Sequence, residues 1–261
     1  MNTKKLDRDE LYSIIGKHSM LFKFGKKEYM QKFQEGEVYM NRIQYYIDLA
    51  KEKNDEFIGD EFEATIPLNN VTMQMLEPDT GNLLGEAKGN LNLTYGDIKK
   101  YPIYCLFSLN FNNVIDNILY VDDNRLEVRY EFTSEQMEQI KKYFGDTVVA
   151  ITDPDKFIEK ILNYSKSNNI CCMNGGVKYY SNNQKEHLVD CKENPDNIAF
   201  WKREKYKEQQ EYRIMLCQEN EKEKIIDIGN IKDITKLLST EEILNTYAIF
   251  TYQLKEEECL S

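Results

Sequence analysis

The 261-residue sequence has only two histidines and no apolar run of membrane-spanning length. His18 and His187 stand in neither an HExxH nor an H-x-E pattern, so metal or triad chemistry centred on histidine has no support. A membrane-spanning helix needs about 20 mostly apolar residues in succession. Lys4 and Lys5 are not followed by an apolar segment, which argues against a secretory signal. We therefore expect a cytoplasmic protein without a membrane partner.

Several common catalytic and nucleotide-binding signatures are also missing. The chain has no GxxxxGK[ST] sequence for a P-loop and no GxSxG sequence for a serine hydrolase. Its six cysteines lack the paired short spacing of a tetrahedral zinc site, and we expect them to be reduced and buried. They are Cys105, Cys171, Cys172, Cys191, Cys217 and Cys259.

The chain also has fewer basic than acidic residues. The chain has 34 lysines and arginines against 45 acidic residues, a formal net charge of -11. The electrostatic field of this negative charge repels phosphate groups, so nucleic acid is not favoured as a partner. A nucleotide or a protein ligand is the partner class that we expect instead. The pattern gives no indication of oligomeric state.

The first half of the sequence alternates between strand and helix patterns. Residues 19–25 and 37–46 are expected to be strands, and the helical segment 26–36 between them ends at a glycine. A turn sequence, PDTGN, separates two strand-like runs within residues 65–100, which predicts a β-hairpin excursion. The aromatic and β-branched run at 101–111 predicts a central strand.

The second half has clearer helix boundaries. Helices are predicted at 133–145, 153–168, 194–210 and 239–245, and strands at 146–152, 170–181 and 211–219, with further strands in KIIDIGN and YAIFTYQLK. No repeat divides the chain. We therefore expect residues 1–261 to form one α+β domain with a mixed, largely antiparallel β-sheet, either continuous or split, flanked by helices.

Two groups of charged residues are candidates for chemistry. Asp60, Glu61 and Glu63 follow a glycine closely enough to share a metal ion or to raise one another's pKa, or they form a solvated acidic loop. Strand alternation from residue 211 places Glu211 and Arg213 on the face opposite Tyr212, Ile214 and Leu216. If that face is solvent, the pair is worth less than about 1 kcal/mol. If it lines a cleft, the pair is an anchor for a polar ligand.

Three segments resemble a broad, largely uncharacterised family of bacterial and phage proteins. They are the opening LFKFGKKEYMQKFQEGEVYMNRIQYYID, the GDEFEA element and the closing FWKREKYKEQQEYRIML. Members of that family combine a strand-helix-strand opening with a Gly-Asp-x-Phe-Glu or Asn-Asp-Pro-Phe-Glu element and a late Gln-x-Glu-Tyr-Arg strand. The family implies no settled activity.

A second resemblance, to ADP-ribosyltransferases, is carried by the sequence Gln209-Gln210-Glu211. It implies that Glu211 binds the nicotinamide ribose of NAD and promotes departure of nicotinamide, and that Gln209 orients the acceptor. Tyr45 or Tyr46 would stack on the nicotinamide. Lys23 stands where the family has histidine or arginine, and without a guanidinium fork it would bind ribose or phosphate less specifically. The resemblance thus predicts NAD as a substrate and a transferase or NAD-cleaving protein of a bacterial or phage defence or toxin system.

Two alternatives from other functional classes remain. One is a non-catalytic acidic protein that senses a nucleotide or blocks a host or defence factor, with the hairpin as an interaction flap. The other is a metal-dependent nuclease that uses Asp60, Glu61 and Glu63, although the net charge and the lack of a strand-borne Asp followed by Glu-x-Lys count against it.

Overall fold

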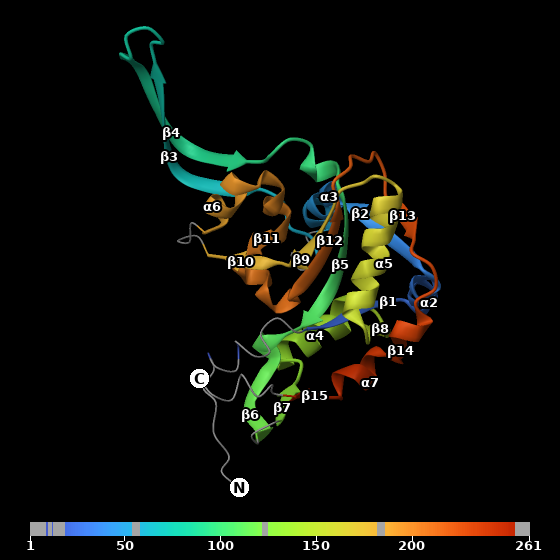
Figure 1. The fold of residues 1–261 in the computed structure, drawn as a ribbon. Coiled ribbons are helices and arrows are strands. Elements are labelled where there is room, and N and C mark those ends of the chain that lie inside the picture. The colour runs from blue at the N-terminus through green and yellow to red at the C-terminus, as the bar shows by residue number, and fades with distance from the viewer. Residues whose placement is uncertain are drawn as a thin grey trace.

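The computed structural model describes Asp9, Tyr12 and residues 19–53, 58–121, 125–181 and 186–253 (Figure 1). Its sheets are mostly antiparallel and flanked by helices, which confirms the predicted α+β class. None of the described helices is both long enough and apolar enough to span a membrane.

The largest sheet has eight strands. They are β1 (Met20–Gly25), β2 (Glu37–Arg42), β5 (Pro102–Leu109), β8 (Thr147–Ile151), β9 (Cys172–Gly176), β12 (Glu211–Leu216), β13 (Lys224–Asp227) and β14 (Thr235–Ser239). All of their pairings are antiparallel.

This sheet is split beside β5. Residues Ile103 to Phe107 of β5 pair with β12 along one edge of the strand. Ile103 and Phe107 also pair with strands along the opposite edge of β5. There Phe107 pairs with Phe22 of β1, whereas Ile103 pairs with Asn41 of β2. β1 leads on to β8 and β14, and β2 leads to β13. The two branches therefore separate between residues 103 and 107.

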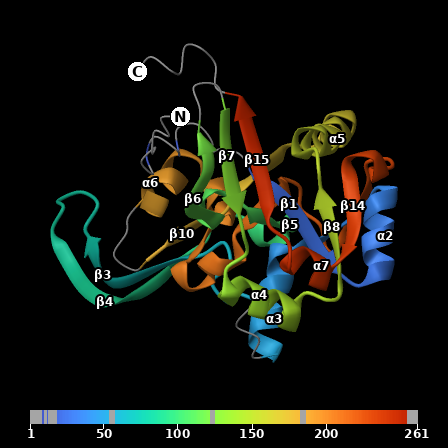
Figure 2. The same cartoon turned by 90° about the horizontal axis from the view of Figure 1, so that it is seen from below.

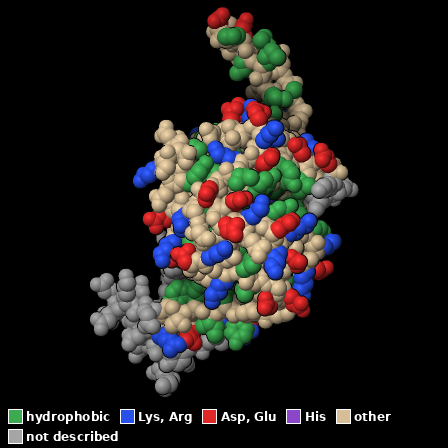
Figure 3. Space-filling view, turned by 90° about the vertical axis from the view of Figure 1, so that its right-hand side faces the viewer, with side chains coloured by type: hydrophobic (Ala, Val, Ile, Leu, Met, Phe, Trp, Pro, Cys, Tyr) green, Lys and Arg blue, Asp and Glu red, His purple; other side chains and the backbone are tan. Residues whose placement is uncertain are grey.

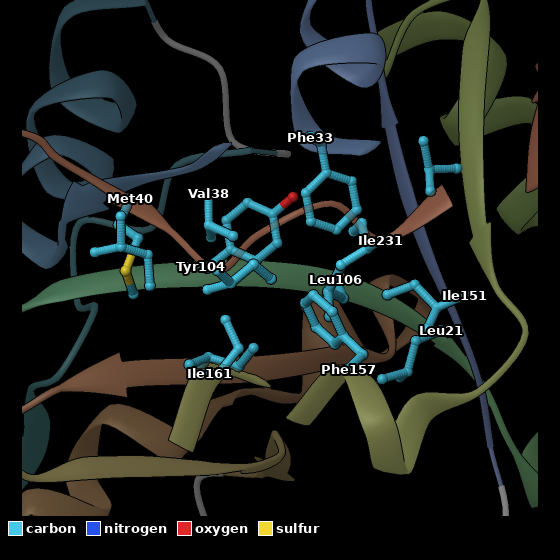
Figure 4. Close-up of a cluster of buried hydrophobic side chains, with 14 of the residues drawn as sticks. Leu21, Phe33, Val38, Met40, Tyr104, Leu106, Ile151, Phe157, Ile161 and Ile231 are labelled. Atoms are coloured by element: carbon cyan, nitrogen blue, oxygen red, sulfur yellow. The ribbon is translucent and has the colours of Figure 1, made fainter. Parts of the chain in front are cut away.

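Hydrophobic residues cover both faces of the sheet. On one face lie α2 (Lys27–Glu35) and α5 (Pro154–Ser167), whose Phe33 and Phe157 pack against Tyr104 and Leu106 of β5 (Figure 4). The opposite face carries two clusters of buried residues. One includes Phe22, Phe107 and the three-stranded sheet, and the other includes Ile103, Met215 and Trp201. Because alternate residues of β5 point to opposite faces, one strand contributes to all three clusters.

Most of the remaining elements lie on this second face (Figure 2), whereas Ile234 packs in the cluster of the first face. The three-stranded sheet consists of β6 (Val114–Val121), β7 (Arg125–Tyr130) and β15 (Ala248–Gln253). The helices are α3 (Ile43–Lys53), α4 (Ser134–Tyr143), α6 (Glu186–Glu193) and α7 (Thr240–Leu244). A parallel pair is formed by β10 (Lys178–Tyr180) and β11 (Trp201–Arg203). The short 3₁₀ helices are η1 (Ile98–Lys100), η2 (Phe111–Asn113), η3 (Pro195–Phe200), η4 (Glu204–Gln209) and η5 (Lys232–Ile234).

Local capping signals fix several helix ends as the sequence indicates. Thr133 and Gln136 exchange side-chain and backbone hydrogen bonds at the start of α4. Asp153 accepts from the backbone N–H of Lys156 at the start of α5, ahead of a proline in the first turn. Gly36 ends α2 with a φ of 111°, a left-handed conformation that glycine adopts at little cost.

The structure corrects two of the predicted elements. Residues 194–210, predicted as one helix, form η3, β11 and η4 in succession. Three strand residues here pair with β10, and this tertiary contact overrides the helical composition. The second strand also ends earlier than predicted, at Arg42, so Tyr45 and Tyr46 lie on α3.

Burial of the cysteines also differs from the prediction. Cys191 is buried, but Cys171 is exposed, and three others are partly exposed. All five described cysteines are free thiols, and Cys259 lies outside the described residues.

The region predicted as a β-hairpin excursion contains β3 (Ile66–Leu76) and β4 (Leu83–Leu93), which pair with each other in a separate sheet. The base of this hairpin contacts the body through Ile66, Leu68 and Leu93 in a hydrophobic cluster. The rest projects as an arm (Figures 1 and 3).

Candidate functional site

A cavity of about 310 Å³ lies on the second face of the sheet, where the two hydrophobic clusters meet. One part of its lining is apolar, with Phe22, Phe24, Phe107, Ile140 and Phe144. The other part is polar and carries Lys23, Asn41, Glu63, Lys202, Gln209, Glu211 and Arg213. Ligand sites commonly combine an apolar wall with a few converging polar groups in this way.

The cavity collects most of the residues that the sequence singled out. Lys23, Tyr45, Tyr46, Gln209, Glu211 and Arg213 all line it. They come from β1, α3, η4 and β12. Of the acidic trio, Glu63 is part of the lining, whereas Asp60 and Glu61 are not among the lining residues.

Glu211 is placed by the backbone that surrounds it. Gln210 adopts a left-handed conformation with φ 39° and ends η4, so the chain turns directly into β12. The Glu211 N–H donates to the Tyr179 hydroxyl over 2.9 Å, and its carbonyl accepts from the Val177 N–H over 2.8 Å. These bonds tie the first residue of β12 to Tyr179 on β10 and to Val177, which lies between β9 and β10.

The Glu211 carboxylate is held between two cations. Its Oε1 lies 2.5 Å from Nζ of Lys202, and its Oε2 lies 2.8 Å from Nε of Arg213. Burial alone would raise the pKa of Glu211, but the charges and hydrogen bonds of Arg213 and Lys202 lower it to about 2. The carboxylate is therefore ionised at neutral pH.

Arg213 joins the GDEFEA turn to β12. Its Nη1 donates to Oε1 of Glu63 over 2.5 Å and to the Ala199 carbonyl over 2.6 Å. The sequence left open whether the pair of Arg213 and Glu211 is exposed to solvent or lines a cleft. Arg213 is only 1% exposed and lines the cavity, so the pair is not an exposed surface pair. Burial would lower the pKa of Arg213, but Glu211 and Glu63 raise it.

Lys202 is the site residue that sequence reasoning missed. Its Nζ donates to Oε1 of Gln209 over 2.6 Å as well as to Glu211, and it lies 3.7 Å from Glu63. Burial would lower its pKa, yet the carboxylates of Glu211 and Glu63 raise it. The helical composition of residues 194–210 conceals the strand β11 in the sequence. The adjacent bulky aromatics Phe200 and Trp201 were the one signal for a strand there.

Lys23 occupies the split in the main sheet. Its Nζ donates over 2.8 Å to the carbonyl of Cys105, a residue in the stretch of β5 where β1 and β2 have separated. Its ammonium also lies 4.3 Å from the centre of the Tyr104 ring. Burial lowers the pKa of Lys23, and the charges of Cys105 and Glu211 oppose this effect. A partly buried lysine is thus held at the edge of the cavity.

The GDEFEA element is a packed turn and not a solvated loop. Asp60 and Glu63 are each 1% exposed, and Asp60 forms an ion pair with Arg203. A Cβ atom on Gly59 would lie 2.5 Å from the backbone nitrogen of Ala50, so only glycine lets the turn lie against α3. Since each buried carboxylate faces a cation, the carboxylates are not arranged around a common centre. Within the described ranges, no group of three or more acidic, histidine or cysteine residues could hold a metal ion.

The two tyrosine candidates differ in exposure. Tyr45 is 44% exposed, while Tyr46 packs against the cluster that contains Met215, and their rings make an edge contact at 5.3 Å. Burial raises the pKa of Tyr46, and burial raises that of the Cys105 thiol to about 12. Cys105 is therefore protonated at neutral pH and unsuited to act as a nucleophile.

Comparisons of the chain with protein-family models, with curated proteins and with solved structures find no match. Function is therefore inferred from the residues of the cavity.

Proposed function

We propose that the chain binds NAD in this cavity and cleaves the bond between nicotinamide and ribose, as the resemblance to ADP-ribosyltransferases implies. The observation that carries the proposal is the meeting of Lys23, Tyr46, Gln209 and Glu211 in one cavity, although they span almost 190 positions of sequence. The resemblance gives these residues one joint task, and their meeting in one cavity from four separate elements supports the proposal.

The ionised Glu211 carboxylate suits the charge that develops in this reaction. Cleavage of a glycosidic bond passes through a transition state in which the anomeric carbon becomes positive. A fixed carboxylate in a partly dry site stabilises such charge without having to reorganise. Lys202 and Arg213 hold both oxygens of Glu211, so the orientation of the group is set before the substrate arrives.

The other residues that line the cavity complement the remaining parts of NAD. Tyr45, Tyr46 and the phenylalanines offer ring faces and edges for a nicotinamide ring. Lys23 and the positive excess of the polar lining favour the anionic pyrophosphate side of the molecule. A volume of about 310 Å³ matches the lower end of ligand pockets, so the adenosine half of NAD would extend outside it.

The test is nicotinamide release from NAD by the purified full chain. Glu211→Gln is expected to lower the rate by roughly 10²- to 10³-fold, the usual effect of removing a group that stabilises transition-state charge. Glu204→Gln is the matched control, because the same chemical change is made seven positions earlier at an exposed side chain. Circular dichroism verifies that both variants fold. A folded wild-type chain that releases no nicotinamide, or a Glu211→Gln chain with full activity, contradicts the proposal.

A second candidate is a non-catalytic binding protein, and the hairpin arm is the observation in its favour. Six of its large apolar side chains are exposed, namely Met73, Met75, Leu76, Leu83, Leu84 and Leu91. Figure 3 shows hydrophobic and acidic side chains together on this arm. A hairpin that projects alone is marginally stable in water, so an arm of this length is explained most simply by a partner that it contacts.

Shortening the arm separates the two candidates. A chain in which residues 71–89 are replaced by a two-residue turn keeps Ile66, Leu68 and Leu93, the contacts of the arm with the body. Unchanged NAD cleavage with an unchanged biological effect would remove the case for the binding protein. A lost effect in a shortened chain that remains folded, with no NAD cleavage in either form, would support it.

A further inference from the structure

The cavity also bears on which molecule receives the ADP-ribose. We infer that the acceptor is water and that the chain releases free ADP-ribose; this inference rests on the proposed function. Three features carry it: the partner of Gln209, the charges around Glu211, and the burial of both side chains.

The amide oxygen of Gln209, the atom that would align an acceptor, already accepts a hydrogen bond from within the protein. That oxygen has two lone pairs, so one partner inside the protein leaves a single position for an acceptor. The Oε1 atom of Gln209 accepts from Nζ of Lys202 over 2.6 Å. Lys202 is 2% exposed, so removing this bond would take a partner from a buried ammonium. Gln209 therefore acts as a positioning residue for Lys202 and Glu211.

The charges disfavour a cationic acceptor. Among the described lining residues, Lys23, Lys202 and Arg213 face two carboxylates, Glu63 and Glu211. Both carboxylates are already paired with Arg213 and Lys202. An arginine or lysine side chain of another protein would add a further positive charge to a low-dielectric site in which three cations already face two carboxylates. Water brings no such charge.

Burial restricts the acceptor as well. The Glu211 side chain is 11% exposed, and Gln209 is 6% exposed. A side chain on a folded macromolecule would have to bring its backbone close to these groups while the nicotinamide riboside filled the cavity. A water molecule fits without displacing any wall of the site.

The chemical step balances with water alone. The bond from C1′ of the ribose to the nicotinamide nitrogen breaks, and its electron pair stays on nicotinamide, which leaves as a neutral molecule. A water oxygen forms the new bond to C1′, and one proton passes to solvent. Nothing is oxidised or reduced, and no further reactant is needed.

The experiment uses the full chain with NAD labelled in its adenosine half, with and without cell lysate. We expect one ADP-ribose for each nicotinamide and less than a twofold rise of macromolecule-bound label over an enzyme-free control. Added methanol, a small neutral nucleophile, is expected to divert part of the product to methyl ADP-ribose. A tenfold or larger rise of macromolecule-bound label with lysate, at the expense of free ADP-ribose, overturns the inference and leaves the proposed function intact.

A Gln209→Ala variant adds an independent readout. If Gln209 positions Lys202 and Glu211, nicotinamide release slows but ADP-ribose remains the product in the same one-to-one ratio. If Gln209 instead orients a macromolecular acceptor, the variant loses transfer and gains free ADP-ribose, and the inference fails. A folded wild-type chain that releases no nicotinamide overturns the proposed function and this inference together.

Discussion

Arg213 on β12 donates over 2.5 Å to Glu63, a residue 150 positions earlier in the chain. The same guanidinium binds Glu211 on its own strand, so one side chain fastens the GDEFEA turn to the start of β12. The two charged features of the sequence, the acidic element and the Glu-Tyr-Arg strand, are therefore parts of a single buried network.

Loss of Arg213 should destabilise the fold strongly. Arg213→Met leaves Glu63 and Glu211 buried without their shared cation, and removal of one partner of a buried pair costs about 3–5 kcal/mol. Urea unfolding measures this difference. Arg125→Met is the control, since Arg125 is 45% exposed in its ion pair with Glu127, and a loss below about 1 kcal/mol is expected there. Equal losses at the two positions would contradict the buried network.

Stability should fall in acid because of Glu211. Its pKa is lowered from 4.5 to about 2, so its stabilising contribution is complete above pH 4.5 and is lost as the pH falls toward 2. The contribution is on the order of 3 kcal/mol. Other carboxylates titrate in the same range, so the measurement compares the wild type with Glu211→Gln by urea unfolding. The difference between the two should shrink as the pH falls from 5 to 3, and a constant difference would count against this assignment.

Gly59 should tolerate no side chain. Gly59→Ala places a Cβ atom 2.5 Å from the Ala50 nitrogen and 2.7 Å from the Tyr46 carbonyl, both backbone atoms of α3. The turn or the helix must move, at a cost of about 1–3 kcal/mol, which is typical of overpacking. Gly175→Ala is the matched control, because a Cβ there meets nothing within 4 Å. Thermal unfolding of both variants decides the matter, and an equally small effect at Gly59 would show that the turn lies elsewhere.

Thiol labelling should distinguish the cysteines. Cys171 is exposed, whereas burial raises the pKa of Cys191 to about 11 and that of Cys105 to about 12. Because the thiolate is the reactive form, brief treatment with iodoacetamide should modify Cys171 first among the five described cysteines. Peptide mapping by mass spectrometry follows each site. Modification of Cys191 at the same rate as Cys171 would disprove the burial described above.

Local patterns were sufficient for much of the fold. The capping box at Thr133, the proline after Asp153 and the glycine after α2 act over three or four residues, so the sequence reveals them directly. Alternation along β12 correctly separated Glu211, Arg213 and Met215 from Ile214 and Leu216, which pack in a different cluster. The prediction of one helix at 194–210 is wrong because β11 is a strand only through its pairing with β10.

The sequence by itself determined the α+β class, most helix ends and the pairing of Glu211 with Arg213, since each depends on neighbours a few positions apart. Only the tertiary structure decided that this pair is buried, that Lys202 and Glu63 complete it, and that Lys23 occupies the split in the sheet. These contacts join segments 82 to 150 positions apart. Periodicity describes the face on which a side chain lies, but only packing determines what covers that face.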